Sequence, residues 1–218
     1  VERTKTRPMA AGKVSKKEAL VLFCVLSFCA FLLILPLRSW YVAGLSVAAL
    51  FLAASYPFTK RFFAVPQAYL GVAFGFGIPM AYAAQLGMIP TVAWALLLAN
   101  VFWAMAYDTE YAMVDRPDDL KIGIKTSAIT FGRFDVPAVM CCYACTLALI
   151  GWVGYQVHAS WAFYAGLGVA LALAVYHYTL IRDREPVRCF KAFLHNNWIG
   201  ASIFAGIVAD FWLVRGVR

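Results

Sequence analysis

The sequence predicts an all-α integral membrane protein with seven transmembrane helices, and three observations support this fold class. Of the 218 residues, 63% are hydrophobic and 14% are charged, with a mean hydropathy of +0.74, well outside the composition of a soluble domain. Long uncharged segments recur along the chain. The basic residues are concentrated in alternate loops, so the net charge of +8 indicates membrane topology and no nucleic-acid-binding surface.

Seven segments are apolar and long enough to cross a hydrocarbon core of about 30 Å. They are residues 19–37, 39–56, 67–85, 91–107, 136–157, 161–181 and 193–214. The third contains Gly71, Gly75, Gly77 and Pro79. Such residues let membrane helices approach closely or bend around a cavity. No soluble domain is visible, so residues 1–218 are expected to form a single transmembrane domain.

The distribution of Lys and Arg predicts which loops share a side of the membrane. Sixteen of the nineteen Lys and Arg fall in residues 1–17 and in every second loop after them. By the positive-inside rule, the N-terminal segment, the loop with Lys60 and the stretch 107–133 all face the cytoplasm.

The stretch 107–133 is the most informative part of the sequence. It follows 45 residues without any charge and holds five of the eleven acids within twelve residues. These acids are Asp108, Glu110, Asp115, Asp118 and Asp119. In an unbroken helix, Asp108, Asp115 and Asp119 would lie within about 40° of one another. Because Pro117 disrupts helical hydrogen bonding, we expect a helix ending near Asp115 and a short helix from about Asp118, with both groups of acids facing one cavity.

Carboxylates this close repel one another unless a divalent cation lies between them. Oxygen ligands with spare coordination positions suit Mg²⁺ that also holds a substrate's phosphates. We therefore predict a Mg²⁺ site formed by Asp108, Asp115, Asp118 and Asp119. A solvated acidic loop is the alternative that composition leaves open; it would be salt-bridged to Arg116, Lys121 and Lys125.

Basic side chains on the same predicted side could bind phosphate oxygens. Lys60 and Arg61 are the first candidates, although cytoplasmic Lys and Arg also simply fix topology. Tyr56 would share a helical face with Lys60 if the second helix extends that far. Arg7 belongs to a basic N-terminal group that suits lipid headgroups as well as it suits a substrate.

Other polar residues within the spans receive structural interpretations. Asp210 lies near the outer end of the last span, and we expect an interfacial position and a pairing with Arg215. His177 and His195 have no evident partner in the sequence, so we expect packing or interface roles.

Several motifs resemble those of the UbiA superfamily of membrane prenyltransferases. The string Y-D-T-E-Y-A-M-V-D-R-P-D-D-L-K-I-G-I-K-T-S-A resembles the family's second aspartate motif and is especially similar to that of the 4-hydroxybenzoate polyprenyltransferases. The residues from Tyr56 to Lys60 resemble a Y-x-x-x-K loop, and Arg61, Pro66 and Gln67 fit the residues after it. Residues 1–15 resemble the segment after the first aspartate motif.

The resemblance implies a nine-helix bundle, of which this sequence supplies the last seven helices. The first motif, N-D-x-x-D-x-x-x-D, is absent from the sequence, so we expect an N-terminally incomplete domain with half of the metal site. The implied reaction is transfer of a polyprenyl group from its diphosphate to 4-hydroxybenzoate, ortho to the hydroxyl, in ubiquinone biosynthesis at the bacterial inner membrane.

The resemblance and the chemistry of the residues together assign roles. Catalysis is assigned to Asp108, Asp115, Asp119 and Lys60, and substrate binding to Tyr56, Lys60, Arg61, Arg7, Tyr111 and Lys125. Aromatic faces such as Tyr56, Tyr107 and Tyr111 could stabilise an allylic carbocation. Two alternatives stay open: a related prenyltransferase with another aromatic acceptor, and a polytopic transporter. A transporter should have acids along its spans, whereas four interior spans carry no charge.

Overall fold

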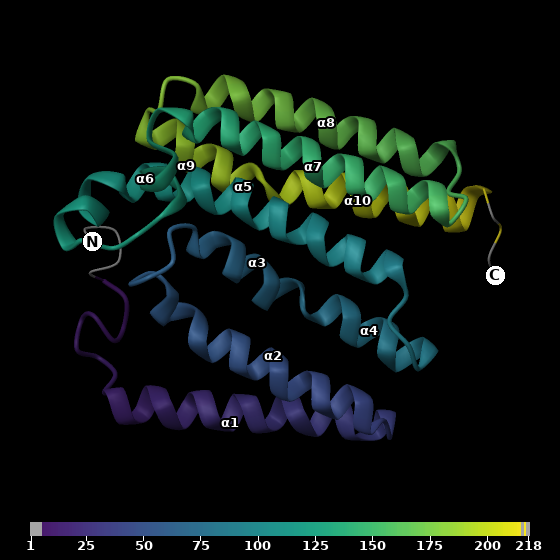
Figure 1. Ribbon diagram of the computed structural model, residues 1–218, viewed down its shortest axis with the longest axis horizontal. Coiled ribbons are helices and arrows are strands. Elements are labelled where there is room, and N and C mark those ends of the chain that lie inside the picture. Colours follow the sequence, from purple (N-terminus) through teal and green to yellow (C-terminus); the bar gives the residue numbers. More distant parts are fainter. Residues whose placement is uncertain (1–5, 215, 217–218) are drawn as a thin grey trace.

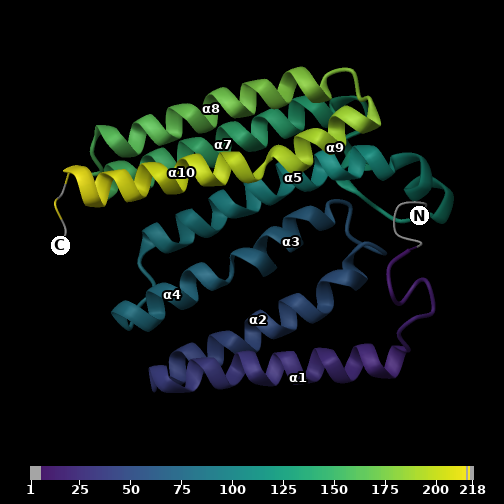
Figure 2. The ribbon, with the colours of Figure 1, turned by 180° about the vertical axis from the view of Figure 1, so that it is seen from behind.

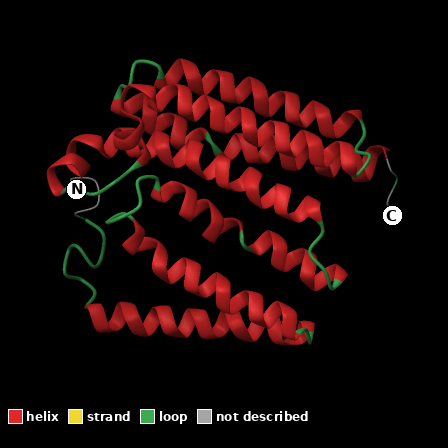
Figure 3. Cartoon of the chain, viewed as in Figure 1, coloured by secondary structure: helices red, strands yellow, loops and turns green. Residues whose placement is uncertain are grey.

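The computed structural model describes residues 6–214 and 216, and these fold into helices joined by short turns (Figures 1 and 3). The elements are α1 (Lys16–Ile34), η2 (Leu35–Leu37), α2 (Trp40–Thr59), α3 (Pro66–Gly75), α4 (Gly77–Leu86), α5 (Thr91–Ile122), α6 (Ser127–Phe131), η3 (Gly132–Phe134), α7 (Asp135–Gln156), α8 (Trp161–Ile181), α9 (Pro186–His195), α10 (Asn197–Ala209) and η4 (Asp210–Val214). The described part of the chain contains no strand.

Seven segments within the described residues are long and apolar enough to cross a membrane. They are Lys16–Leu37, Trp40–Thr59, Pro66–Leu86, Thr91–Ile122, Ser127–Gln156, Trp161–Ile181 and Pro186–Val214. The prediction of an all-α integral membrane protein with seven spans is confirmed. Each predicted span overlaps one of these segments, and the boundaries differ by at most a few residues except in the fourth, fifth and seventh segments. The fourth extends further at its C-terminal end, and the fifth and seventh begin further toward the N-terminus.

The packing of α3 on α5 shows why the third span is rich in glycine. A Cβ on Gly71 would lie 2.6 Å from the Cα of Val101, and a Cβ on Gly75 would lie 2.7 Å from the side chain of Asn100. The two backbones therefore approach more closely than any larger residue allows. The span also breaks between α3 and α4 at Phe76, as the Gly and Pro content suggested.

The helices are arranged so that α5 lies at the centre of the bundle (Figure 1). It packs against α3 on one side and against α7 and α9 on the other, while α8 and α10 pack on each other. The hairpin of α1 and α2 lies at the edge beyond α3 and α4, and α1 has no buried residue (Figures 1 and 2). The hydrophobic core accordingly lies among α5, α7, α8 and α9.

The connections fall at two ends of the bundle. The loops α2–α3, α5–α6 and α8–α9 lie at the same end as the N-terminus, whereas the turns α1–α2, α4–α5 and α7–α8 lie at the other end with the C-terminus (Figures 1 and 2). The loops that carry most of the Lys and Arg are thus brought to one end, as the charge distribution predicted.

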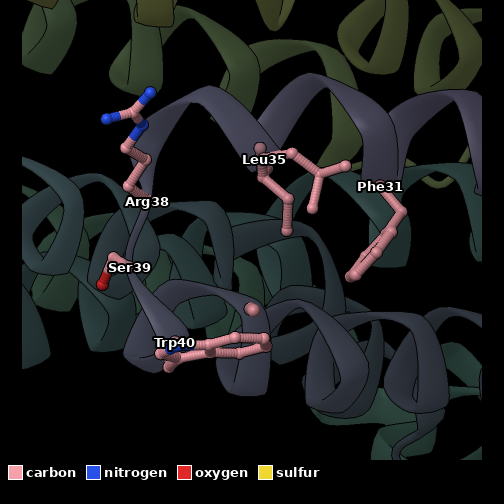
Figure 4. Close-up of a pocket in the computed structure, with 7 residues that line it drawn as sticks. Phe31, Leu35, Arg38, Ser39 and Trp40 are labelled. Carbon is pink, nitrogen blue, oxygen red and sulfur yellow. The ribbon is translucent and has the colours of Figure 1, made fainter.

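At the opposite end, a pocket of about 270 Å³ lies at the turn between α1 and α2. Figure 4 shows Phe31, Leu35 and Trp40 around it, with Arg38 and Ser39 at the turn. Its lining is mostly apolar and contains no acid, so it does not share the chemistry of the acidic stretch.

One prediction about the acidic stretch is wrong. Helix α5 does not end near Asp115; it continues through Pro117 to Ile122, and no separate helix begins at Asp118. A proline inside a helix removes one hydrogen bond, at a cost of about 3 kcal/mol, and this loss is local. Because α5 is anchored along its length by α3, α7 and α9, the helix continues past this defect. The short helix of this region, α6, begins only at Ser127.

Candidate functional site

A pocket of about 160 Å³ opens at the charged end of the bundle, and the acidic stretch forms one wall of it. The residues that line it are Arg7, Lys60, Gln67, Asp108, Tyr111, Ala112, Asp115, Asp119, Ile124 and Thr126. They come from the N-terminal segment, from α2 and α3, from α5 and from the loop after α5. Segments far apart in sequence therefore converge on one polar cavity.

The acidic wall follows from the periodicity of α5. Asp108, Asp115 and Asp119 are separated by seven and four residues, which places them on one face of a helix. Tyr111 lies on the same face between them. Asp108 and Asp115 are half-buried and Asp119 is buried. Since α5 passes Pro117 without a break, this common face persists to Asp119.

Lys60 reaches the pocket from the C-terminal end of α2. Helix α2 extends to Thr59, and the Lys60 ammonium lies 6.0 Å from the centre of the Tyr56 ring. The expectation that these two residues share a helical face is confirmed. The ring provides a modest cation–π attraction that orients the ammonium.

The loop after Lys60 is held against the segment that follows α5. The backbone N–H of Lys125 donates to the carbonyl of Lys60 at 3.0 Å, and its ammonium donates to the carbonyl of Phe62 at 3.2 Å. The hydroxyl of Thr130 donates to the carbonyl of Ala64. These bonds join the two loops into one rim, which fixes Lys60 beside the acids.

Gln67 closes the inner end of the pocket. Its side chain is buried, its Oε1 accepts a bond from the backbone N–H of Ser127 at 3.0 Å, and it lines the pocket together with Asp108. The hydroxyl of Ser127 in turn contacts that of Thr109 at 2.6 Å. Gln67 thus connects α3 to α6, and through Ser127 to α5, at the pocket that Asp108 also lines.

The pocket includes some of the predicted site residues and leaves others outside its lining. Asp108, Asp115, Asp119, Lys60, Tyr111 and Arg7 line it, whereas Tyr56, Arg61, Asp118 and Lys125 do not. Arg61 and Lys125 are exposed on the rim. The carboxylate of Asp118 lies 3.4 Å from the Lys121 ammonium, as the alternative of a salt-bridged loop would have it.

The donor set determines what kind of cation the pocket could hold. Within residues 6–214 and 216, no three His, Cys, Asp or Glu side chains are close enough to form a complete metal site. Mg²⁺, however, is typically held by one or two carboxylates together with substrate phosphates and water. Three carboxylates on one pocket wall fit a cation that binds in that way, with Lys60 and Arg7 available for the remaining phosphate oxygens.

A second ionic cluster fixes the neighbouring loops. The carboxylate of Asp135 is fully buried at the start of α7, and the guanidinium of Arg184 lies 2.7 Å from it. Arg116 on α5 approaches the same carboxylate at 3.5 Å. Hydrogen bonding to Asp135 raises the pKa of Arg184 above its ordinary value. The cluster connects the α8–α9 loop to α7 and α5, next to the pocket.

The two histidines have polar partners that the sequence did not reveal, whereas the expectation of an interfacial Asp210 paired with Arg215 stays a prediction. His177 and His195 do have polar partners: the ring nitrogens of the two residues lie 3.2 Å apart, and His177 also contacts Glu110 at 3.0 Å. Asp210 is buried, and its carboxylate accepts a bond from the backbone N–H of Ser160 at 2.6 Å. Its expected partner, Arg215, lies outside the described residues.

Fold and site together define a class of protein: an integral membrane protein whose helical bundle presents aspartates and basic side chains to a pocket at one end, an arrangement suited to a diphosphate and a divalent cation. The sequence matches the UbiA prenyltransferase family over residues 1–199, and the chain belongs to this family.

Individual relatives are consistent with the family assignment. The chain is 71% identical to the 4-hydroxybenzoate octaprenyltransferase of Dechloromonas aromatica (strain RCB), over 99% of this chain and 73% of that protein. It is 67% identical to the protein of the same name from Azoarcus sp. (strain BH72), over 97% of this chain and 73% of the relative. Among solved structures, an apo UbiA homologue from Aeropyrum pernix K1 superposes with a TM-score of 0.83 at 23% identity, covering 97% of this chain and 78% of that one. This last likeness concerns the fold.

Proposed function

We propose that this protein transfers a polyprenyl group from a polyprenyl diphosphate to 4-hydroxybenzoate, at the ring carbon ortho to the hydroxyl, as a step of ubiquinone biosynthesis. The observation that carries the proposal is the convergence of Asp108, Asp115, Asp119 and Lys60 on one pocket. The chain that forms this pocket is 71% identical to a relative named 4-hydroxybenzoate octaprenyltransferase.

The acidic residues of the pocket would bind the diphosphate through a cation, and the basic residues would bind it directly. One or two of the carboxylates of Asp108, Asp115 and Asp119, together with the substrate's phosphate oxygens and water, would hold a Mg²⁺ ion. That ion would neutralise charge on the diphosphate as the allylic carbon–oxygen bond breaks. The ammonium of Lys60 would donate to oxygens of the same leaving group, and the Tyr56 ring orients it for this contact. Arg7 would close the mouth of the pocket over the diphosphate.

The prenyl carbon needs an electron-rich and dry surrounding once the bond to oxygen weakens. Tyr111 lines the pocket, and its ring packs against that of Phe193 on α9 with ring centres 4.8 Å apart. The ring of Phe193 also lies 6.3 Å from that of Tyr107. The three rings form an aromatic cluster, and its member Tyr111, which lines the pocket, would stabilise positive charge there.

The bond changes of the proposed reaction balance without an oxidant or reductant. The leaving diphosphate takes the electron pair of the broken carbon–oxygen bond, and the acceptor ring supplies the pair for the new carbon–carbon bond. The ring then loses one proton, which restores its aromaticity.

The proposal also includes the membrane in which the protein lies and the side that the pocket faces. The pocket and the loops with most of the Lys and Arg share one end of the bundle, and that end would face the cytoplasm of a bacterial inner membrane. A polyprenyl tail would then extend from the pocket toward the lipid.

The proposal is tested by mass spectrometry of lipid extracts from membranes given Mg²⁺, a polyprenyl diphosphate and 4-hydroxybenzoate. Two proteins are compared: this chain, and this chain preceded by the N-terminal segment of the Dechloromonas relative. Prenylated 4-hydroxybenzoate from either protein supports the proposal, and product from the longer protein alone shows that catalysis requires residues beyond this chain.

Absence of product from both proteins, when both are inserted and folded, would refute the choice of acceptor. Other hydroxylated aromatic acids supplied in the same assay then test the first alternative. Uptake of a labelled cation into sealed vesicles, with no prenylated product, would favour a transporter.

A further inference from the structure

A buried polar network lies on the side of α5 that faces away from the acidic pocket. Its members are Trp103, Glu110, Tyr143, His177, His195 and Asn196. They come from α5, α7, α8 and the junction of α9 with α10. No common role for these residues is evident in the sequence, and the proposed chemistry uses none of them.

The contacts of the network centre on one carboxylate oxygen. Oε1 of Glu110 accepts from the Tyr143 hydroxyl at 3.0 Å and lies 3.0 Å from Nδ1 of His177. Tyr143 also accepts a bond from the side-chain amide of Asn196. The oxygen of that amide accepts a bond from the indole N–H of Trp103. Every bond of Glu110 therefore depends on the position of a different helix.

The carboxylate of Glu110 depends entirely on the contacts of its Oε1 atom. Its side chain is completely buried, and its other oxygen, Oε2, has no hydrogen-bond partner among the described residues. A carboxylate inside a membrane bundle is costly unless it is paired. If α5 turned so that Oε1 left Tyr143 and His177, the whole carboxylate would be unpaired in an apolar environment.

The two network residues of α5 occupy one face of that helix. Trp103 and Glu110 are seven residues apart, so their side chains point within about 20° of each other. At about 100° of rotation per residue, the side chain of Glu110 points about 140° to 180° away from those of Asp108, Asp115 and Asp119. The rotation of α5 that satisfies the network is thus the rotation that directs the acids into the pocket.

Small side chains make up part of the buried surface of α5 near the site. The buried residues of α5 near the site include Ala104, Ala106 and Ala112, whose small side chains give the helix a smooth surface. In coiled coils, a single buried polar residue can define helix register where apolar packing does not. The same physical reasoning applies to a helix surrounded by apolar neighbours in a bilayer.

We propose that Glu110, held by Tyr143, His177 and Asn196, is a positioning residue that sets the rotation of α5 and thereby directs the acidic face into the pocket. The inference rests on the proposed function only where it concerns the metal. The rotation itself can be measured without any metal.

The first measurement compares two positions on α5 in a background without native cysteines. Tyr111 lines the pocket and is half-buried, whereas Met113, two residues further, is packed in the core. With Tyr111→Cys a small hydrophilic thiol reagent should react quickly, and with Met113→Cys slowly. Adding Glu110→Leu should make the two rates converge, while Glu110→Gln, which keeps an acceptor oxygen, should preserve their order.

The second measurement is binding of Mn²⁺ in the presence of inorganic pyrophosphate, followed by electron paramagnetic resonance. Loss of a residue that orients metal ligands typically lowers metal affinity about tenfold to a hundredfold. We expect a loss of that size for Glu110→Leu and a much smaller one for Glu110→Gln. Thr146→Val is the matched control, because Thr146 makes a buried bond to the carbonyl of Ala99 on α5 but is outside the network.

The outcomes separate this inference from the proposed function. Unchanged thiol rates in folded Glu110→Leu protein overturn the inference, and so does the same convergence in Thr146→Val. If Glu110→Leu does not fold, Trp103→Phe takes its place, because it removes only the indole N–H donor from the network. The thiol rates and the Mn²⁺ affinity of Trp103→Phe then decide in the same way. If the parent protein does not bind Mn²⁺ with pyrophosphate, the proposed metal site fails, and the thiol rates still test the rotation.

Discussion

Replacing Gly71 with alanine should test how tightly the site depends on the close approach of α3 and α5. The new Cβ would lie 2.6 Å from the Cα of Val101 and 3.1 Å from the Cβ of Ala104, whereas ordinary contacts begin at 3.4 Å. The obstructing atom at 2.6 Å belongs to the backbone, so no change of side-chain rotamer relieves it. The helices must separate by at least the difference between 2.6 and 3.4 Å.

That separation has an energetic and a functional consequence. Overpacking of this kind destabilises a protein by about 1–3 kcal/mol. Gly71 lies one helical turn after Gln67, on the same side of α3. Moving α3 outward therefore pulls Gln67 away from Asp108 and Ser127, which loosens the inner end of the pocket.

The assay is thermal unfolding in detergent, combined with the rate of prenyl transfer by a catalytically competent form of the protein. Gly77→Ala is the control, since Gly77 is helical and a Cβ there meets nothing within 4 Å. This control should be neutral or stabilising by up to about 1 kcal/mol. Equal stability and equal rates for the two variants would refute the idea that the contact of Gly71 with Val101 supports the site.

Three further predictions concern the pocket and the topology. Asp108→Asn or Asp115→Asn should lower turnover about a hundredfold or more without preventing membrane insertion, whereas Asp118→Asn should have a smaller effect; near-normal rates for the first two would remove their metal role. Lys60→Ala should weaken diphosphate binding about tenfold, because a charge-assisted bond is lost; unchanged affinity in a binding titration would restrict Lys60 to fixing topology. A reporter fused after Val157 should report the outer side of the membrane; a cytoplasmic signal there would invert the proposed orientation.

The fold could be predicted because its determinants are local or additive. Span length and hydropathy depend on consecutive residues, and topology depends on a sum of charges, so neither requires knowledge of packing. The acidic face is also local, because Asp108, Asp115 and Asp119 belong to one helix. The prediction failed at Pro117, where tertiary anchoring of α5 by its neighbours overrides the local effect of proline.

The supporting residues of the site were harder to predict because their contacts join distant segments. Gln67 meets Ser127 across 60 residues, and Trp103 meets Asn196 across 93. No periodicity connects such pairs in a single sequence. The contacts of Lys125 with Lys60 and with the loop after it could not be predicted for the same reason, because they depend on how two loops fold together.

Glu110 is the residue for which the sequence did hold a usable signal. The helical arithmetic that gathers the three pocket acids on one face of α5 also places Glu110 about 160° from Asp108. An acid on the far side of a membrane helix needs a partner inside the bundle. His177 is the one histidine of a span, Trp161–Ile181, that carries no Asp, Glu, Lys or Arg, and it is that partner. Two faces of α5 therefore carry acids with different roles. The face with Asp108, Asp115 and Asp119 lines the pocket, whereas the opposite face buries Glu110, whose contacts set the rotation of the helix.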